Sequence, residues 1–198
     1  MKHSKLWMLA AILICGMGFT SCGEKKTDKE PEKKVEAETK LVFDAAACDA
    51  AVEDYLENEI GKNYAKGEVC IASPYVLATD FGNLEDILVW GDFWVFNYNL
   101  SGDTLKTVSG GNHPGLMHLK QTKDGCEVTK FEVVADGADN EESAKKIFGD
   151  KYDVFRDING NDEKREDIRR HFILDYLKKH NMSATMVQDY GWPAVALR

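Results

Sequence analysis

DILVWGDFWVFNYNL, residues 86–100, is rich in β-branched and aromatic side chains and therefore predicts one long β-strand. Alternate residues of a strand share a face. One face of this strand would carry Trp90, Asp92, Trp94, Phe96 and Tyr98. The other face would carry Val89, Gly91, Phe93, Val95 and Asn97. A carboxylate between two indoles is an unusual combination, so the first face is the leading candidate for a functional site.

Further strands are predicted on both sides of this stretch. Residues 67–81, GEVCIASPYVLATDF, have strand character, but Pro74 places their middle at a sheet edge or a bend. Turn residues at 101–103 and a Lys-Asp-Gly hairpin signal at 123–125 separate the later segments. Those segments are residues 103–111, 116–122 and 126–136. Strands joined by short turns predict an antiparallel meander.

A helix is predicted before the sheet, in residues 43–61. Asp44 is placed to cap its N-terminus and Gly61 to end it. Apolar side chains recur every four residues and would form the buried stripe. They are Cys48, Val52, Leu56 and Ile60.

The last third of the chain is predicted to be helical again. Residues 140–150 form a short helix ended by Gly149, and residues 161–181 form a longer one that starts near Asp162 and stops at Asn181. The core stripe of the longer helix would contain Ile168, Phe172 and Tyr176, with Ile173 and Leu177 beside them. In residues 188–198, a Gly-Trp-Pro turn is expected to tuck Trp192 against the body.

A helix, an antiparallel sheet and then further helices predict an α+β fold in which the first helix packs on a curved sheet. This element order resembles the cystatin-like and NTF2-like architectures, which are common among small bacterial envelope lipoproteins. The resemblance rests on the order of elements alone, so it implies no functional residues for this chain.

The N-terminus, MKHSKLWMLAAILICGMGFTSC, has the layout of a secretory signal peptide. Lys2 and Lys5 precede an apolar run of ten residues, 6–15, whereas a membrane-spanning helix needs about 20. Phe19-Thr20-Ser21-Cys22 resembles the lipobox of bacterial lipoprotein precursors, although Phe19 replaces the favoured leucine. That resemblance implies a signal peptide at residues 1–21 and acylation of Cys22. The alternative is a plain signal peptide that leaves a stray thiol.

The resemblance to lipoproteins also implies a location. Gly23 follows Cys22, so the aspartate that retains some lipoproteins in the inner membrane is absent, and we expect the outer membrane of a Gram-negative cell envelope. Residues 22–40 are rich in charge and poor in apolar side chains, which predicts a disordered tether. A short helix with Glu–Lys pairs is the alternative. Residues 41–198 would then be a single domain.

Charge and cysteine content limit the possible partners. Residues 41–198 hold 17 basic and 28 acidic side chains, so a nucleic-acid partner is excluded because it needs a basic surface. The same region has three cysteines, Cys48, Cys70 and Cys126. An oxidising envelope permits disulfides, but an odd number allows at most one bridge within the chain. The sequence leaves the pairing open, with buried free thiols as the default expectation.

Asp92 is the main candidate for chemistry. Burial between Trp90 and Trp94 would raise its pKa, as in a general base, with Tyr98 as a hydrogen-bond donor. The indoles would equally suit stacking on sugar rings or apolar ligands. In the simpler interpretation the aromatic rings fill the space between sheet and helix, and Asp92 points to water from a bulge at Gly91.

Two further stretches contain residue types that are typical of ligand sites. Residues 109–118, SGGNHPGLMH, contain two glycines and two histidines but lack the features of a phosphate loop or a third zinc ligand, so a loop closing one end of the sheet is expected. Residues 157–166 place Asp157, Asn159 and Glu166 at calcium-loop positions, but Phe155 occupies the first ligand position. A turn and a helix cap at Asp162 explain the same residues without metal.

No cofactor motif and no catalytic triad stand out. The leading hypothesis is therefore a lipid-anchored, non-catalytic binding module for a small molecule, a glycan or an envelope protein. One alternative is a small isomerase or hydrolase that uses Asp92 and Tyr98 in a sheet-lined pocket. The other is a structural assembly factor of the envelope.

Overall fold

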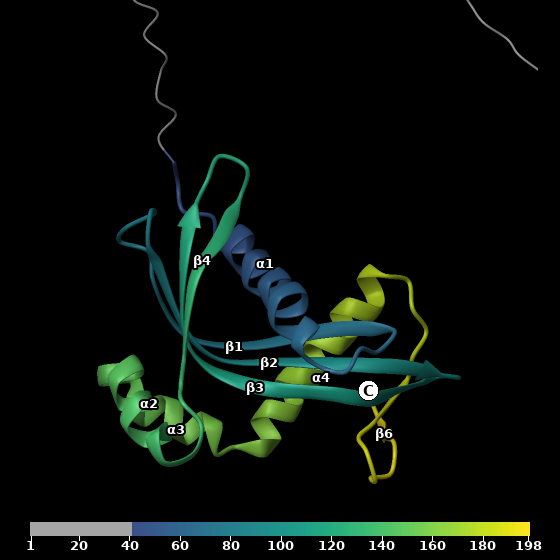
Figure 1. Cartoon of the computed structure of the whole chain (residues 1–198). Coiled ribbons are helices and arrows are strands. Elements are labelled where there is room, and N and C mark those ends of the chain that lie inside the picture. Colours follow the sequence, from purple (N-terminus) through teal and green to yellow (C-terminus); the bar gives the residue numbers. More distant parts are fainter. Residues whose placement is uncertain (1–40) are drawn as a thin grey trace, which may run out of the picture. The chain divides into compact units, whose positions relative to one another are not determined.

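A computed structural model describes residues 41–198 as an α+β fold with a strongly curled mixed sheet (Figure 1). The strands are β1 (Val69–Asp80), β2 (Ile87–Ser101), β3 (Thr104–Gln121), β4 (Cys126–Val133), β5 (Met186–Gln188) and β6 (Val195–Ala196). The longer helices are α1 (Ala45–Tyr55), α2 (Asn140–Phe148), α3 (Tyr152–Asn159) and α4 (Asp162–Lys179). The short helical turns are η1 (Leu56–Ile60), η2 (Gly61–Asn63), η3 (Gly137–Asp139) and η4 (Gly149–Lys151). The predicted signal peptide, lipidated Cys22 and tether lie outside the described residues.

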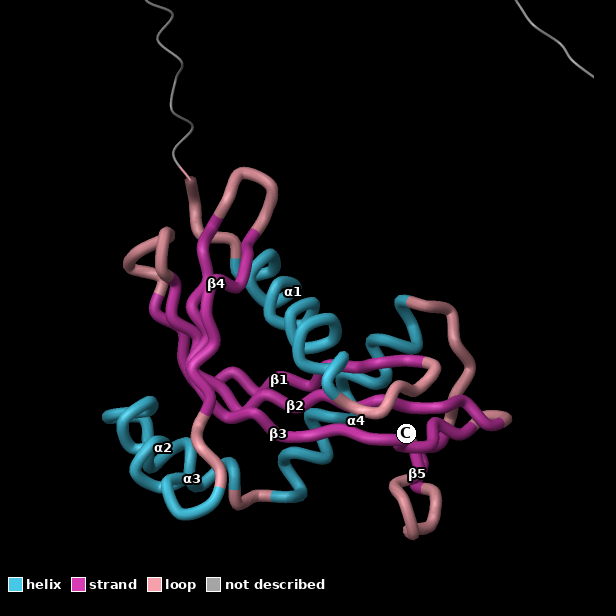
Figure 2. Tube along the Cα trace, in the orientation of Figure 1, coloured by secondary structure: helices cyan, strands magenta, loops and turns pink. Residues whose placement is uncertain are grey.

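The predicted meander is confirmed for β1 to β4, which pair antiparallel in chain order. The prediction omitted β5 and β6: β5 pairs parallel with the start of β3, and β6 continues the sheet beyond it. Register shifts in the β1–β2, β2–β3 and β3–β4 pairings accompany the curl that is visible in Figure 2. Within residues 41–198, no helix is both long and apolar enough to cross a membrane.

The expected loop at residues 109–118 is wrong, because these residues lie inside the 18-residue strand β3. Its glycines sit where the neighbouring chain approaches closely: a Cβ on Gly115 would overlap the backbone of Glu132, and one on Gly111 would overlap Tyr64. The carbonyl of Pro114 accepts from Val134 N just beyond the end of β4. The N–H that proline lacks would point to that same side, so its absence does not interrupt the pairing of β3 with β2. The turn-like composition therefore reflects close packing.

Pro74 lies in β1, the edge strand of the sheet, as predicted. Proline removes one donor from this edge of the sheet, and the amide of Ala72 donates to the side chain of Glu57, at Oε1, at 3.1 Å. Both features protect the edge against pairing with another strand.

Helix α1 covers one face of the sheet. Asp44 caps it, as predicted, by accepting from Ala47 N at 3.1 Å. The predicted stripe is largely confirmed, since Cys48, Val52 and Leu56 are buried against the sheet. The predicted stop at Gly61 is wrong: its φ of −58° is helical, and the chain continues as a turn to Asn63.

Helices α2, α3 and α4 cover the opposite face. The predicted ends at Gly149 and Asn181 are confirmed, since their φ angles are 52° and 53°. The cap of α4 is Asn161 and not Asp162, because the Asn161 side chain accepts from Lys164 N. The buried line of α4 consists of Arg169, Ile173 and Leu177, while Ile168, Phe172 and Tyr176 are half-buried.

Candidate functional site: a groove beside helix α4

The predicted alternation along β2 is correct. The face that carries Trp90, Asp92 and Tyr98 turns toward α2, α3 and α4, and the face that carries Val89 and Phe93 turns toward α1. Asp92, however, does not point to water from a bulge. It is fully buried, with 0% of its surface exposed.

The Asp92 carboxyl has an incomplete set of partners. Trp94 Nε1 donates to its Oδ2 at 3.3 Å, whereas Oδ1 has no hydrogen-bond partner within residues 41–198. The side-chain oxygen of Asn112 is also buried without a partner there. Burial raises the pKa of Asp92, and the hydrogen bond from Trp94 and the charge of Arg165 oppose that shift. Solvent does not reach this carboxyl.

The two indoles have separate roles. Trp90 donates from Nε1 to Ile147 O at 3.0 Å, and the Lys151 ammonium lies 4.4 Å from its ring centroid, so it anchors α2 to the sheet. Trp94 stacks on Phe96 with ring centroids 5.5 Å apart and lines a cavity of about 40 Å³. That volume holds at most a few water molecules. Small-molecule sites are much larger, at about 300–1,000 Å³. The cavity at Trp94 is thus too small for a ligand, as in the simpler interpretation in which aromatic rings fill the space between sheet and helix.

Asp92 and Tyr98 are too far apart to act on the same reacting atom of a substrate. They are six residues apart in β2, which is about 20 Å at the rise of an extended strand. Tyr98 is fully buried, its hydroxyl accepts from Arg169 Nε at 2.9 Å, and burial raises its pKa despite the nearby guanidinium.

The other candidate ligands are dispersed. Asp157 and Asn159 lie on α3, and Glu166 lies on α4 with its carboxylate 3.3 Å from Arg169. His113 accepts or donates a 2.8 Å hydrogen bond with Tyr64, and His118 bridges Asp86 and Glu132. Residues 41–198 hold no cluster of three or more His, Cys, Asp or Glu side chains arranged for a metal ion.

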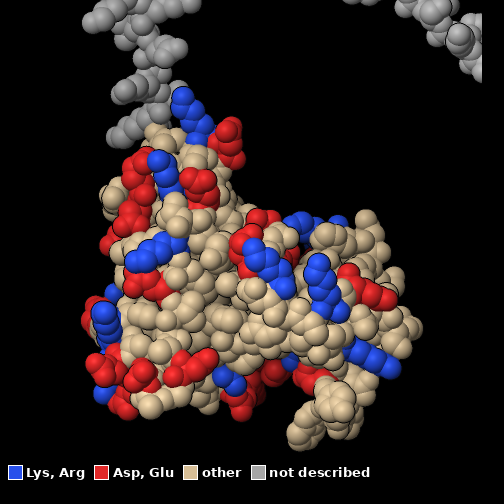
Figure 3. Space-filling view, in the orientation of Figure 1, with Lys and Arg blue, Asp and Glu red and all other residues tan. Residues whose placement is uncertain are grey.

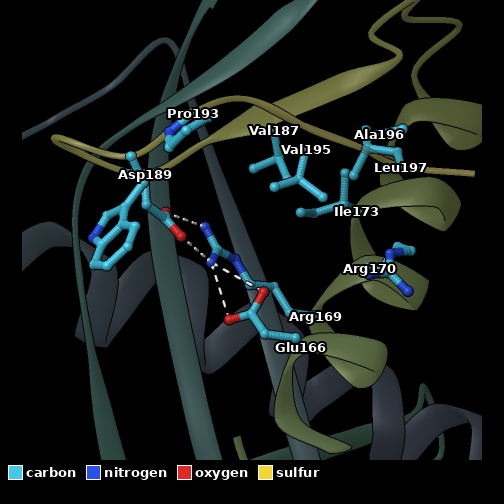
Figure 4. Close-up of a pocket in the computed structure, with 11 residues that line it drawn as sticks. Glu166, Arg169, Arg170, Ile173, Val187, Asp189, Pro193, Val195, Ala196 and Leu197 are labelled. Carbon is cyan, nitrogen blue, oxygen red and sulfur yellow. Dashed lines mark hydrogen bonds and ion pairs between the residues drawn. The ribbon is translucent and has the colours of Figure 1, made fainter. Parts of the chain in front are cut away.

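The structure instead reveals a groove of about 450 Å³ between α4 and the C-terminal strands β5 and β6 (Figure 4). Its apolar wall is formed by Ile173, Val187, Trp192, Pro193, Val195, Ala196 and Leu197. Its charged end is formed by Glu166, Arg169 and Asp189, while Arg170 lines the groove nearer to Ile173. Figure 4 shows the ion pairs at one end and the aliphatic side chains of Val187, Val195 and Ile173 at the other.

Arg169 organises the charged end. Arg169 is 4% exposed, and all five N–H groups of its guanidinium have acceptors. The acceptors are Tyr98 Oη, Thr107 Oγ1, both Asp189 carboxylate oxygens and the Glu166 carboxylate. Burial by itself lowers the pKa of Arg169, but hydrogen bonds to Asp189 and Tyr98 outweigh burial and raise it. Arg169 thus holds the wall in place and has no free donor for a ligand.

The carboxylates of the groove keep free acceptor sites. The Glu166 and Asp189 side chains are 55% and 43% exposed, and the hydrogen bond from Arg169 lowers the pKa of Asp189. The expectation that Trp192 tucks against the body is wrong, because it is 72% exposed at the rim. Gly191, with φ 78°, turns the chain there, and the following residues return as the edge strand β6.

Sequence reasoning missed this groove because its walls come from α4, β5 and β6, which share no common sequence pattern. The one local signal was an arginine on the apolar stripe of α4, where Arg169 precedes Ile173 and Leu177 at intervals of four residues. A charged residue in such a line needs a buried partner, which the sequence alone does not identify.

Charge is spread over the rest of the surface. In Figure 3, acidic side chains gather over α2 and α3, interspersed with lysines, and the face shown has no continuous basic patch. This distribution agrees with the acidic balance of the sequence.

No protein-family model, no curated protein and no solved structure matches this chain.

Proposed function

We propose that this protein is a lipid-anchored envelope binding module that takes a small amphiphilic molecule in the groove between α4 and β5–β6. The observation that carries the proposal is the groove itself. Its volume of about 450 Å³ lies in the range of small-molecule sites, and an apolar wall with a few polar groups at one end is typical of them.

The polar end favours a head group that donates hydrogen bonds or carries positive charge. The guanidinium of Arg169 is fully occupied, whereas Glu166 and Asp189 present accessible carboxylate oxygens. Arg170, which lines the groove nearer to Ile173, is engaged by Asp167 at 2.9 Å. An ammonium or a hydroxyl head would therefore be preferred over a carboxylate, in agreement with the acidic balance of residues 41–198.

Anchoring of the module rests on the lipobox-like sequence that ends at Cys22. Acyl chains on one terminal residue give stable membrane attachment, because each buried methylene contributes about 0.8 kcal/mol. The charged segment to residue 40 would then space the domain from the lipid surface. In this arrangement the groove samples amphiphiles close to a membrane.

The proposal is tested by titration with three probes that share a chain and differ in head group: octylammonium, octyl glucoside and octanoate, each below its micelle concentration. Trp192 lines the groove, so its fluorescence should report binding. The expected order of affinity is octylammonium, then octyl glucoside, then octanoate. Equal affinities would contradict the role of the carboxylates, and no saturable binding of any probe would contradict a small-molecule site and favour a protein partner.

Three variants test whether the probes bind in the groove. Trp192→Phe should remove the signal but keep binding measured by calorimetry. Glu166→Gln should weaken octylammonium about 2- to 5-fold, as for an exposed charge pair, and leave octyl glucoside nearly unchanged. Tyr190→Ala is the matched control, because this aromatic residue is 94% exposed beside the groove and does not line it.

A further inference from the structure

Two of the three cysteines in the described residues lie side by side. The Sγ atoms of Cys48 in α1 and Cys126 at the start of β4 are 2.7 Å apart, although the residues are 78 positions apart in the chain. This separation is shorter than two unbonded sulfur atoms normally reach, and it exceeds the disulfide bond length of about 2.05 Å by only a fraction of an ångström. A small side-chain movement would close the bond.

The third cysteine is elsewhere. Cys70 lies on the edge strand β1, where its Sγ is 3.7 Å from the carbonyl of Glu57 and packs against Gly61. Its neighbours are therefore the helical turns after α1. The odd number of cysteines thus resolves into one adjacent pair and one single thiol.

We propose that Cys48 and Cys126 form a disulfide that ties α1 to β4, and that Cys70 stays reduced. The bridge joins the N-terminal helix to the sheet through the core that contains Val52, Phe93 and Met117. It goes beyond the binding role of the groove, since it concerns the opposite face of the sheet.

The bond requires a disulfide oxidant, as an oxidising compartment supplies. Cys126 is the more exposed of the pair, so its thiolate attacks one sulfur of the oxidant and releases the other as a thiolate. The Cys48 thiolate then attacks Sγ of Cys126, forms the bond and displaces the second sulfur. The two cysteines lose two protons and two electrons, and the oxidant is reduced to two thiols.

The environment also indicates when the bond forms. Burial raises the pKa of the Cys48 thiol to about 12, and the neighbouring Cys126 adds to the shift. Since the thiolate is the reactive form, exchange is slow once α1 has packed. The bridge should therefore form during folding and afterwards resist mild reductants.

Peptide mapping tests the pairing directly. The full chain, folded with glutathione disulfide present, is denatured, alkylated without reduction and digested with trypsin. Cys48, Cys70 and Cys126 fall in three different peptides, residues 41–62, 67–106 and 124–130. The expected result is a cross-link of 41–62 to 124–130 and an alkylated 67–106. Alkylation of all three, or a cross-link that contains 67–106, would overturn the proposal.

Thermal unfolding supplies a second test with a matched control. Cys48→Ser and Cys126→Ser should each lower the Tm of the oxidised protein by about 5–15 °C, and reduction of the wild type should lower it similarly. Cys70→Ser should keep the reductant-sensitive Tm. If reductant leaves the wild-type Tm unchanged and mapping finds no bridge, the two thiols are in contact without a covalent bond and the proposal is wrong.

Discussion

Arg169 and Asp189 form a bidentate ion pair, with Nη1–Oδ2 at 2.9 Å and Nη2–Oδ1 at 2.7 Å, that joins α4 to the segment after β5. The hydroxyl of Thr107 in β3 donates to Asp189 Oδ1 at 2.6 Å, and the hydroxyl of Tyr98 in β2 accepts from Arg169 Nε. One guanidinium therefore connects the helix, two central strands and the C-terminal segment. The wall of the groove depends on this connection.

Replacing the arginine should destabilise the fold. Arg169→Met keeps much of the volume but leaves the buried Tyr98 hydroxyl and the half-exposed Asp189 carboxylate without their partner. We expect a loss of about 2–4 kcal/mol in the free energy of unfolding, measured with urea; Asp189 is partly hydrated, which reduces the cost. Arg170→Ala, which breaks a surface pair with Asp167, should cost less than about 0.5 kcal/mol. Equal losses would contradict the role given to Arg169.

Asp92→Asn should stabilise the protein at neutral pH. The amide keeps the shape of the carboxyl and removes a buried charge. It also supplies a donor beside the Asn112 oxygen, which has no partner within residues 41–198. We expect a gain of about 1 kcal/mol at pH 7, the cost of one unpaired buried group. Urea unfolding measures it, with Asp124→Asn in the exposed hairpin as the control.

The gain from Asp92→Asn should depend on pH. Burial raises the folded-state pKa of Asp92 above the unfolded value, so its contribution to stability is complete below the unfolded pKa and is lost as pH rises through the folded pKa. The difference between Asp92→Asn and wild type should therefore be small near pH 4 and grow toward neutral pH. A difference that is constant across this range would contradict a raised pKa.

Gly115→Ala should be costly. Gly115 is buried in β3, and a Cβ there would overlap the carbonyl of Glu132 in β4, which is backbone and has little room to move. We expect a loss of about 1–3 kcal/mol in chemical denaturation. Gly160→Ala is the matched control: its φ of −82° suits alanine, its nearest contact is at 3.4 Å, and the change should be neutral or slightly stabilising. Equal tolerance at both positions would show that β3 and β4 are less closely packed.

The elements that the sequence predicted correctly are those with local signals. Asp44 caps α1, Gly149 ends α2, Pro74 marks an edge strand, and the period of two along β2 places Trp90 and Asp92 on one face. Each of these depends on residues within one turn or one strand. The α+β class follows from their order.

The errors arise where distant segments decide the outcome. Residues 109–118 have the composition of a loop, but Tyr64 and Glu132 fill the space that their glycines leave. Gly61 stays helical because the following turn packs against the sheet, and a Cβ there would meet Cys70. Asp92 is buried although a lone carboxylate favours water, because α3 and α4 cover that face.

The groove was beyond prediction for the same reason. It forms only when β5 pairs with the start of β3 and Asp189 meets Arg169, 20 residues away in sequence. A three-residue strand and a two-residue strand carry almost no pattern of their own. Their position is fixed by pairing and by one ion pair.

The measurement that most directly tests the location of the ligand site is the octylammonium affinity of two variants, one in the groove and one in the predicted indole face. Ala196→Trp places a large ring in the groove, and Asp92→Asn changes the buried carboxyl. The groove proposal predicts a loss of more than about 10-fold for Ala196→Trp and no change for Asp92→Asn. Full affinity in Ala196→Trp together with a loss in Asp92→Asn would contradict it and return the site to β2.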